Sequence, residues 1–247
     1  MFFPLKDLNP TQRFPIVTLF LIAANIVVFV YELSLGSELN AFVASFGAIP
    51  YEITHATDLV GPVSGTPIVH EKGPIIPHLT LLTSMFIHGG VMHILGNMLY
   101  LWIFGNNIED ILGPIKFLIF YLVTGVIAAL SHVFIQPSSV IPTVGASGAV
   151  SGVLGAYLVV YPRARVLTLI FLGIFIRIML LPAWVLLVFW FVIQALAGVL
   201  SLSRGLPSGA GVAWFAHIGG FIAGFILIRV MWRRQTEWGR TQDSDAY

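Results

Sequence analysis

Residues 145–161 read GASGAVSGVLGAYLVVY, an apolar run that carries Ser147 near its start. The run repeats glycine at i, i+3, i+7 and i+10, beginning at Gly145, which places Gly148 and Gly152 in one smooth stripe along an α-helix. Small residues of this kind allow helices to approach closely within a bilayer. A polar group inside such a segment is energetically expensive, so Ser147 is a candidate functional residue.

Residues 213–232 repeat this pattern around a histidine. Gly220 and Gly224 form a small-xxx-small pair, and His217 lies about one helical turn before Gly220. Packing this pair against the glycine stripe of residues 145–161 brings the imidazole toward the Ser147 hydroxyl. The glycines alone are typical of helix packing, but a serine and a histidine that lie on the two stripes at matching depth favour a functional pair.

The composition places the chain among integral membrane proteins. Hydrophobic residues make up 57% of the chain, charged residues make up 9%, and the mean hydropathy is +0.94. Six stretches are long enough to cross a bilayer, namely residues 15–33, 86–104, 117–135, 145–161, 183–201 and 213–232. They predict an all-α fold, a polytopic bundle of six transmembrane helices that forms one membrane domain over residues 15–232. Tails of residues 1–14 and 233–247 flank it.

The basic residues indicate the orientation of the bundle. If both termini are cytoplasmic, ten of the twelve Lys and Arg residues lie inside or at the inner interface, and only Lys72 and Arg204 lie outside. We therefore expect both tails to be cytoplasmic. A six-helix core with short tails also predicts a protein of the bacterial plasma membrane. The chain lacks the basic stripe that is typical of nucleic-acid binding, so no nucleic-acid partner is expected. The absence of cysteine excludes disulfides and cysteine-ligated metals.

Two segments between the spans are expected to be irregular. Residues 166–181 are apolar but carry Arg177 and stop at Pro182, and a seventh crossing there would move His217 to the membrane face opposite Ser147. We interpret them as a re-entrant or interfacial element on the cytoplasmic side. Residues 34–85 form an outer loop too long for a simple connector, which predicts a folded element that lies against the bilayer.

Polar groups on three predicted spans share one depth. Ser147, His217 and the pair His93 and Asn97 lie roughly 5 to 15 Å from the outer ends of their helices, at about 1.5 Å per residue. His93 and Asn97 are four residues apart and so share a helix face. His88 is rotated by about 140° from His93 on the same expected helix, which favours a structural role for it.

The chemistry of this layer is that of a nucleophile and its base. A serine hydroxyl is a weak nucleophile until a base such as imidazole takes its proton. The start of a helix also offers unpaired N–H groups and a positive dipole end, which suit an oxyanion. The carboxylates near the inner ends of the spans, Glu109 and Asp110, lie on the wrong side of the membrane, so we expect a Ser-His dyad and no acidic third member.

Two other classes of membrane protein fit the sequence less well. A zinc protease would need the HExxH motif, whereas the second span reads His88-Gly-Gly-Val-Met-His93. A transporter would place ion-coupling carboxylates at mid-depth in its spans and would often show an inverted repeat, and neither is visible in this sequence.

At these residues the chain resembles the rhomboid family of intramembrane serine proteases, over roughly residues 85–232. The matching motifs comprise His88, His93 and Asn97; Gly145, Ser147 and Gly148; and Ala216, His217, Gly220 and Gly224. The resemblance implies a six-helix core with Ser147 as nucleophile and His217 as general base. It also implies that His93, Asn97 and the Ser147 backbone N–H hold the oxyanion in a water-filled cavity open to the outer side.

The resemblance further implies that the fifth helix and the following loop, residues 202–212, gate substrate entry. Ser151 stands where some members carry an aromatic residue that stacks on the catalytic histidine. The expected function is hydrolysis of a peptide bond in or near the outer end of a substrate's transmembrane helix, through an acyl-enzyme and without metal or cofactor. The expected partners are transmembrane protein substrates and the lipid bilayer. The alternative is a non-catalytic rhomboid-like protein that binds or escorts transmembrane segments; inactive relatives typically lack the serine or the histidine.

Overall fold

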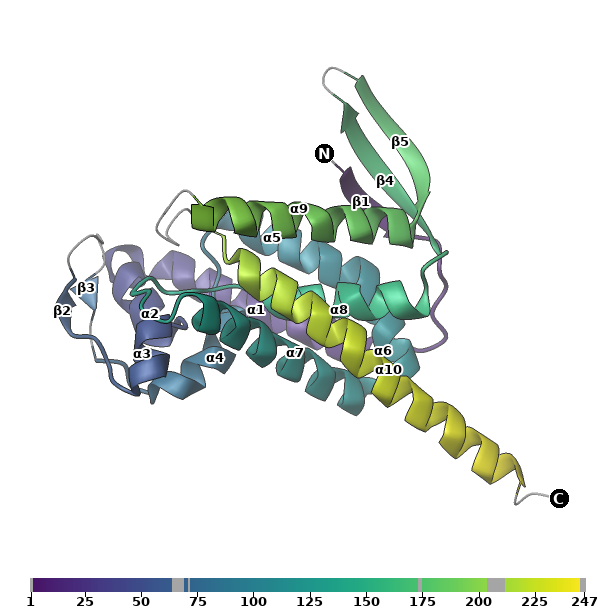
Figure 1. The fold of residues 1–247 in the computed structure, drawn as a ribbon, viewed down its shortest axis with the longest axis horizontal. Helices are drawn as coiled ribbons and strands as arrows, with labels where there is room; N and C mark the ends of the chain where they lie inside the picture. The colour runs from purple at the N-terminus through teal and green to yellow at the C-terminus, as the bar shows by residue number, and fades with distance from the viewer. Residues whose placement is uncertain (1, 64–68, 71, 173–174, 204–211, 245–247) are drawn as a thin grey trace.

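The computed structural model describes residues 2–63, 69–70, 72–172, 175–203 and 212–244 as a helical membrane bundle (Figure 1). Four helices in the described chain are long and apolar enough to cross a membrane: α1 (Ile16–Ser34), α7 (Pro114–Ile135), α9 (Ala183–Ser203) and α10 (Trp214–Ser244). A bent pair of helical segments adds a fifth candidate span, and α8 (Ser147–Val160) is a shorter apolar helix. The predicted polytopic helical bundle is confirmed. Residues 204–211, which hold Arg204 and most of the expected gating loop, lie outside the described residues.

The second span lies further along the chain than hydropathy predicts. Its helix begins with α5 (Val91–Tyr100), continues through a π-helical segment (Leu101–Gly105) and ends with α6 (Asn106–Leu112). Gly90, at a φ of 150°, separates it from the preceding segment, and the two are bent by 82°. The helix extends past its polar residues because Glu109 is buried, where it accepts hydrogen bonds from the N–H groups of Val17 and Thr18. That acid therefore caps the start of α1.

The long segment between α1 and α5 is folded. It contains α2 (Leu39–Phe46), α3 (Pro50–His55), α4 (Thr80–Thr83), three short 3-10 turns (Gly36–Glu38, Pro77–Leu79 and Ser84–Phe86) and a small hairpin of β2 (Gly61–Pro62) and β3 (Val69–His70). Ala48, Ile53 and Leu81 pack with Val133 in a cluster of their own, so this segment rests on the last turns of α7. Its contact with a bilayer stays a prediction.

A three-stranded antiparallel sheet joins the bundle at its other end. It has the order β1-β4-β5, from β1 (Phe2–Asp7), β4 (Arg165–Leu172) and β5 (Phe175–Pro182). The sequence does not predict these strands, because a short apolar run is ambiguous between helix and strand until its pairing partner is known. The partner of β4 is a strand from the first residues of the chain, where a tail is expected.

Glycines place α8 between α7 and α10. A Cβ at Gly220 would collide with the carbonyl oxygen of Gly148, and one at Gly224 with the carbonyl oxygen of Gly152. Gly148 and Gly152 themselves face Ala128 and Thr124 of α7. The two stripes therefore meet, with the glycines of α10 on the backbone of α8, and those of α8 turned to a third helix.

Candidate active site

Ser147 is the first residue of α8, and two tethers hold the loop before it. Ala48 and Thr143 form a β-bridge with N–H···O distances of 3.0 and 2.9 Å, and the Gly145 N–H donates to the carbonyl oxygen of Ser84 at 2.9 Å. Gly145 has a φ of +123°, and a Cβ there would lie 2.7 Å from the His93 ring. Only glycine lets the chain enter α8 this close to His93. The folded outer segment thus supports the serine.

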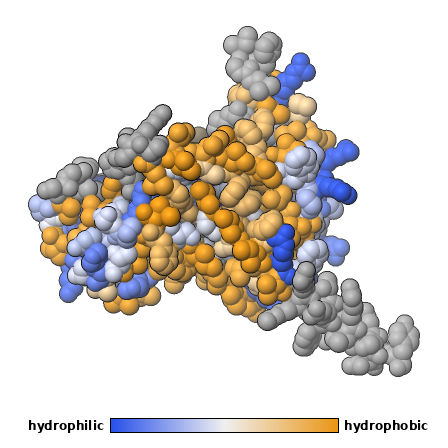
Figure 2. Space-filling view, viewed as in Figure 1, coloured by the Kyte–Doolittle hydropathy of each residue, from blue (hydrophilic) through white to orange (hydrophobic). Residues whose placement is uncertain are grey.

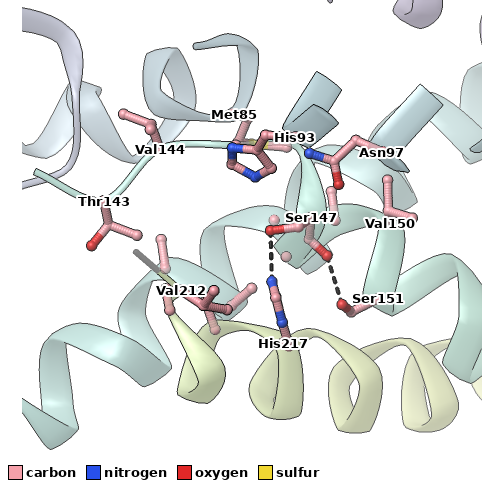
Figure 3. Close-up of a pocket in the computed structure, with 18 of the residues that line it drawn as sticks. Met85, His93, Asn97, Thr143, Val144, Ser147, Val150, Ser151, Val212 and His217 are labelled. Atoms are coloured by element: carbon pink, nitrogen blue, oxygen red, sulfur yellow. Dashed lines mark hydrogen bonds between the residues drawn. The ribbon is translucent and has the colours of Figure 1, made fainter. Parts of the chain in front are cut away.

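The structure brings Ser147 and His217 into hydrogen-bond contact. His217 Nε2 lies 2.7 Å from Ser147 Oγ (Figure 3). His217 Nδ1 lies 2.7 Å from Gln194 Oε1. An amide oxygen can only accept, so the shared proton of the second bond belongs to Nδ1. The neutral ring then has its lone pair on Nε2, and the Ser147 hydroxyl donates to it. This is the tautomer that a general base for Ser147 requires.

Helix α9 orients His217. This role of α9 was not predicted from the sequence. Gln194 accepts from His217 Nδ1, and Trp190, one turn earlier, lies against the imidazole ring with centroids 5.9 Å apart. Ser151 instead donates to the backbone carbonyl of Ser147 at 2.6 Å. The signal available in the sequence was Gln194 itself, a lone amide in an apolar span.

His93 and Asn97 lie on the opposite side of Ser147 from His217 (Figure 3). The Gly89 N–H donates to His93 Nδ1 at 3.3 Å, so the neutral ring carries its proton on Nε2. His93 Nε2 would lie 2.7 Å from a Cβ at Gly145, so this nitrogen faces the loop that leads into Ser147. Asn97 is 7% exposed, and its Nδ2 has no hydrogen-bond partner among the described residues. Neither donor therefore has an acceptor in the described parts of the chain, and both residues line the space beside the serine.

The first turn of α8 adds backbone donors to this space. The first N–H groups of a helix have no acceptor within the helix, and α8 has no side-chain cap. The positive end of the helix dipole lies there as well. Negative charge that develops next to Ser147 would therefore meet N–H groups from two helices.

His88 lies outside the helix that carries His93, so the rotation between the two residues is not that of a continuous helix. The break at Gly90 puts His88 in the preceding turn, where its ring meets the His93 ring edge-on at 5.2 Å. Its backbone N–H donates to the Glu32 carboxylate at 3.2 Å. His88 thus packs behind His93 and does not line the cavity described next.

Ser147 opens into a cavity of about 720 Å³. Its walls come from α5, α7, α8, α9, α10 and the loop before α8, and its polar lining includes Ser147, His217, His93, Asn97, Gln194 and His132. The volume is in the range of pockets that hold a drug-sized ligand. In the described parts of the chain, no group of three or more His, Asp or Glu side chains is arranged to hold a metal ion.

The carboxylates at the far end of the second span serve the fold. Asp110 accepts from the backbone N–H groups of Gln12 and Arg13 at 3.0 and 2.9 Å. Glu109 caps α1 as described above. Both acids are thus occupied in holding the entry to the first helix.

Comparison with known proteins finds one family. The family model described as Rhomboid domain matches residues 78–234. RHOMBOID-like protein 7 of Arabidopsis thaliana is 30% identical over 246 residues, which cover 90% of this chain and 68% of that protein. RHOMBOID-like protein 6, mitochondrial, of the same plant is 33% identical over 172 residues, 68% of this chain and 48% of that one. The Rhomboid protease GluP of Bacillus subtilis is 32% identical over 145 residues, 59% of this chain and 24% of that one. The chain spans about half to two thirds of the length of these plant relatives.

Proposed function

The chain belongs to the rhomboid family, and we propose that it is an intramembrane serine protease that cleaves substrates in or near the outer end of their transmembrane helices. The observation that carries the proposal is the 2.7 Å contact between Ser147 Oγ and His217 Nε2 at the wall of a cavity. The relative named as a rhomboid protease, from Bacillus subtilis, supports the same activity.

The proposed reaction proceeds through an acyl-enzyme. His217 Nε2 takes the hydroxyl proton as Ser147 Oγ attacks the carbonyl carbon of the scissile peptide. The imidazolium then gives that proton to the leaving amine, and a water activated by the same nitrogen hydrolyses the ester. No cofactor takes part in these steps.

The oxyanion of the tetrahedral intermediate would be held from the side opposite the histidine. His93 Nε2–H, Asn97 Nδ2–H and the N–H groups at the start of α8 are the proposed donors. Donors of this kind act strongly because they are already oriented before charge develops. The unpaired Asn97 amide supports this role, since a buried donor without a partner is costly unless a ligand satisfies it.

Gln194 and Trp190 are proposed as positioning residues for His217. The amide oxygen of Gln194 keeps the proton on Nδ1, and the indole of Trp190 limits rotation of the ring. A neutral amide stabilises the imidazolium less than a carboxylate does, but it selects the same tautomer. Both residues lie on the helix that the family resemblance assigns to the substrate gate, so a substrate that displaces α9 would also loosen the base.

The site is proposed to face the outer side of the membrane, with both termini in the cytoplasm, from the distribution of basic residues. The relatives do not support the bacterial plasma membrane that the sequence suggests, because they include proteins named as mitochondrial from a plant and from yeast. The proposed substrates are membrane proteins.

A fluorophosphonate probe tests the proposal without a known substrate. The probe reacts with a serine made nucleophilic by a neighbouring base, so the purified protein should be labelled at Ser147. Ser147→Ala and His217→Ala should each abolish labelling, as expected of residues that act as a unit. Ser151→Ala, one turn further along the same helix, is the matched control and should be labelled.

The possible results separate the candidate functions. Labelling that persists in Ser147→Ala would contradict the assignment of the nucleophile. Absence of labelling in wild-type protein that a cooperative thermal unfolding transition shows to be folded would favour the non-catalytic alternative. Labelling that a chelator removes would point to a metal-dependent site.

A further inference from the structure

The β1-β4-β5 sheet has apolar side chains on both of its faces. Residues directly opposite each other in the ladder point to the same side, so the register sorts them. Val166, Thr168 and Ile170 of β4 are buried on the face turned to the bundle. The other side, which we call the outward face, consists of Phe3, Leu167, Leu169, Phe171, Ile176, Ile178 and Leu180, with Lys6 and Arg165 at the end nearest α9.

The outward face is unusual for a sheet in water. An antiparallel sheet with one covered face normally presents polar residues on the other. Here Ile176 is 62% exposed, Ile178 60% and Leu180 44%, and the two charged members, Lys6 and Arg165, lie together at one end of the face. A contiguous exposed apolar patch of this kind marks a contact with an apolar partner.

The outward face adjoins the surface that meets lipid. β5 ends at Pro182, and α9, a membrane-spanning helix, begins at the next residue. Near this junction α9 exposes Trp184 and Val188, and tryptophan is typical of the membrane interface. Phe2 of β1 packs on Phe189 of α9 with ring centroids 4.5 Å apart, so the sheet is fastened to the same helix. The sheet therefore starts at the level where α9 enters the bilayer.

The direction of β4 and β5 also fits a membrane surface. In Figure 1 these two strands leave the end of α9 at a steep angle to the helices and extend beyond the bundle toward the top of the view. Because the helices cross the membrane, an element steeply inclined to them runs beside the bundle, over the neighbouring lipid. Figure 2 shows a broad hydrophobic band over the flank of α9 and α10, with hydrophilic side chains gathered at the end from which the strands leave.

The charges near the hairpin are basic. Residues 163–182 contain Arg163, Arg165 and Arg177, all exposed, and no Asp or Glu. Arg177 lies opposite Ile170 in the ladder and so points away from the outward face. Basic side chains beside an apolar face suit the anionic headgroups of a lipid surface.

We propose that the outward face is a lipid-docking surface, seated on the bilayer interface beside α9 at the end of the bundle remote from Ser147. β5 is an edge strand, and one row of its backbone groups is unpaired within the sheet. Such groups are tolerated among hydrated headgroups and excluded from the hydrocarbon core. The sheet therefore lies at the interface, with its aliphatic side chains among the parts of the acyl chains nearest the headgroups. This proposal does not depend on the catalytic one.

Single cysteines provide the test, because the chain has none of its own. Nitroxide labels at Ile178→Cys and Leu180→Cys report the outward face, and a label at Arg177→Cys reports the opposite face on the same strand. Leu196→Cys on the exposed side of α9 calibrates lipid, and Ser138→Cys in the exposed loop after α7 calibrates water. The full chain is reconstituted in vesicles of phosphatidylcholine and phosphatidylglycerol. Collision rates with oxygen, which concentrates in lipid, and with a water-soluble nickel chelate are measured by electron paramagnetic resonance.

The expected result is a high ratio of oxygen to nickel collisions at Ile178→Cys and Leu180→Cys, within about twofold of Leu196→Cys, and a several-fold lower ratio at Arg177→Cys. A ratio at both outward positions equal to that of Ser138→Cys would overturn the proposal. Exclusion of both reagents, with spin–spin broadening that disappears on mixing with unlabelled protein, would also overturn it. That result would mean that a second copy of the chain covers the face. Unchanged thermal stability of each variant shows that the label reports the native sheet.

Discussion

Gln194, His217 and Ser147 form a chain of two hydrogen bonds that draws on three different helices. Each bond limits what the next group can be: the amide oxygen sets the imidazole tautomer, and the tautomer leaves Nε2 free to accept from the hydroxyl. On the other side of the serine, Asn97 offers a buried donor without an acceptor among the described residues. The site is thus asymmetric, with a base on one side and donors on the other.

Replacing Asn97 should impair the reaction far more than substrate binding. If Asn97 Nδ2 donates to the oxyanion, Asn97→Ala should lower kcat roughly a hundredfold and leave KM nearly unchanged. Steady-state cleavage of a model single-span substrate measures both constants. His88→Ala is the comparison, because His88 lies behind His93 and outside the cavity, and it should lose much less. A larger loss in His88→Ala would contradict the assignment of the donors.

Gln194 can be tested as a positioning residue by exchanging its acceptor. Gln194→Met keeps the length of the side chain but removes the oxygen, and loss of one hydrogen bond should slow kcat and fluorophosphonate labelling about tenfold, with little change in KM. Gln194→Glu retains an acceptor and should recover most of the rate. Ile193→Met, at the exposed neighbouring position, controls for the methionine. Equal losses in Gln194→Met and Gln194→Glu would mean that Gln194 acts through packing alone.

At the level of helices, close contact between α8 and α10 sets the distance between nucleophile and base. Gly220 and Gly224 place α10 directly on the backbone of α8, and Gly148 and Gly152 leave room for α7 on its other side. A short helix such as α8 is held by its neighbours more than by its own propensity. The same contacts that stabilise α8 therefore align Ser147 with His217.

A single methyl group on α10 should separate the two helices. Gly224→Ala drives a Cβ into the carbonyl oxygen of Gly152, and overpacking of this kind costs about 1 to 3 kcal/mol. We expect a lower thermal unfolding midpoint in detergent and a parallel loss of labelling at Ser147. Gly96→Ala is the matched control, because a Cβ there meets nothing within 4 Å and alanine favours a helix interior by about 0.5 to 1 kcal/mol. A Gly224→Ala protein as stable as Gly96→Ala would show that the helices have room to spare.

Across the molecule as a whole, the two ends of the bundle have different roles: one supports the loop before Ser147, and the other anchors strand β1. The end near Ser147 is built on the folded segment between α1 and α5, which holds the serine loop through Ala48 and Thr143. The opposite end holds β1 against the bundle through a buried cluster. There Asn107 Nδ2 and the Tyr157 hydroxyl donate to the same oxygen of Asp7, at 2.7 and 2.9 Å. This cluster joins the first strand to two spans.

The stability of that end should depend on pH through Asp7. Burial raises the pKa of Asp7 above its ordinary value, although Tyr157 and Asn107 donate to its carboxylate. The native state then binds the proton more tightly than the unfolded chain, so this contribution to stability is present at low pH and is lost as the pH rises above about 4 through the native pKa. Asp7→Asn, which mimics the protonated form, should unfold at a higher temperature than wild type at neutral pH, and the difference should shrink toward pH 4.

The matched variant is Asp7→Ala, which loses the acceptor and should be less stable than Asp7→Asn throughout the range. Thermal unfolding followed at several pH values measures all three proteins. A wild-type midpoint that rises relative to Asp7→Asn between pH 4 and 7 would contradict the prediction, because it would mean that the charged form is the one stabilised in the fold.

Hydropathy was enough to predict a polytopic helical membrane protein, and motifs around His93, Ser147 and His217 indicated the rhomboid family by resemblance, because both signals are local to each segment. The pairing of Ser147 with His217 was proposed from glycine stripes and shared depth, and the structure places the two side chains in contact. The end of the second span was missed because polar Asn107 and Glu109 look like a helix end until their buried partners are known.

Other features depend on contacts between segments that are far apart in the chain, and no local pattern encodes such contacts. Gln194 reaches His217 only because α9 packs beside α10, and β1 becomes a strand only because β4 lies beside it. The break at Gly90 separates His88 from the helix face on which the sequence pattern placed it. The spacing of residues therefore determines which segments enter the membrane and which residues are candidates, whereas packing determines which of these residues meet, because a hydrogen bond or a ladder requires both of its partners.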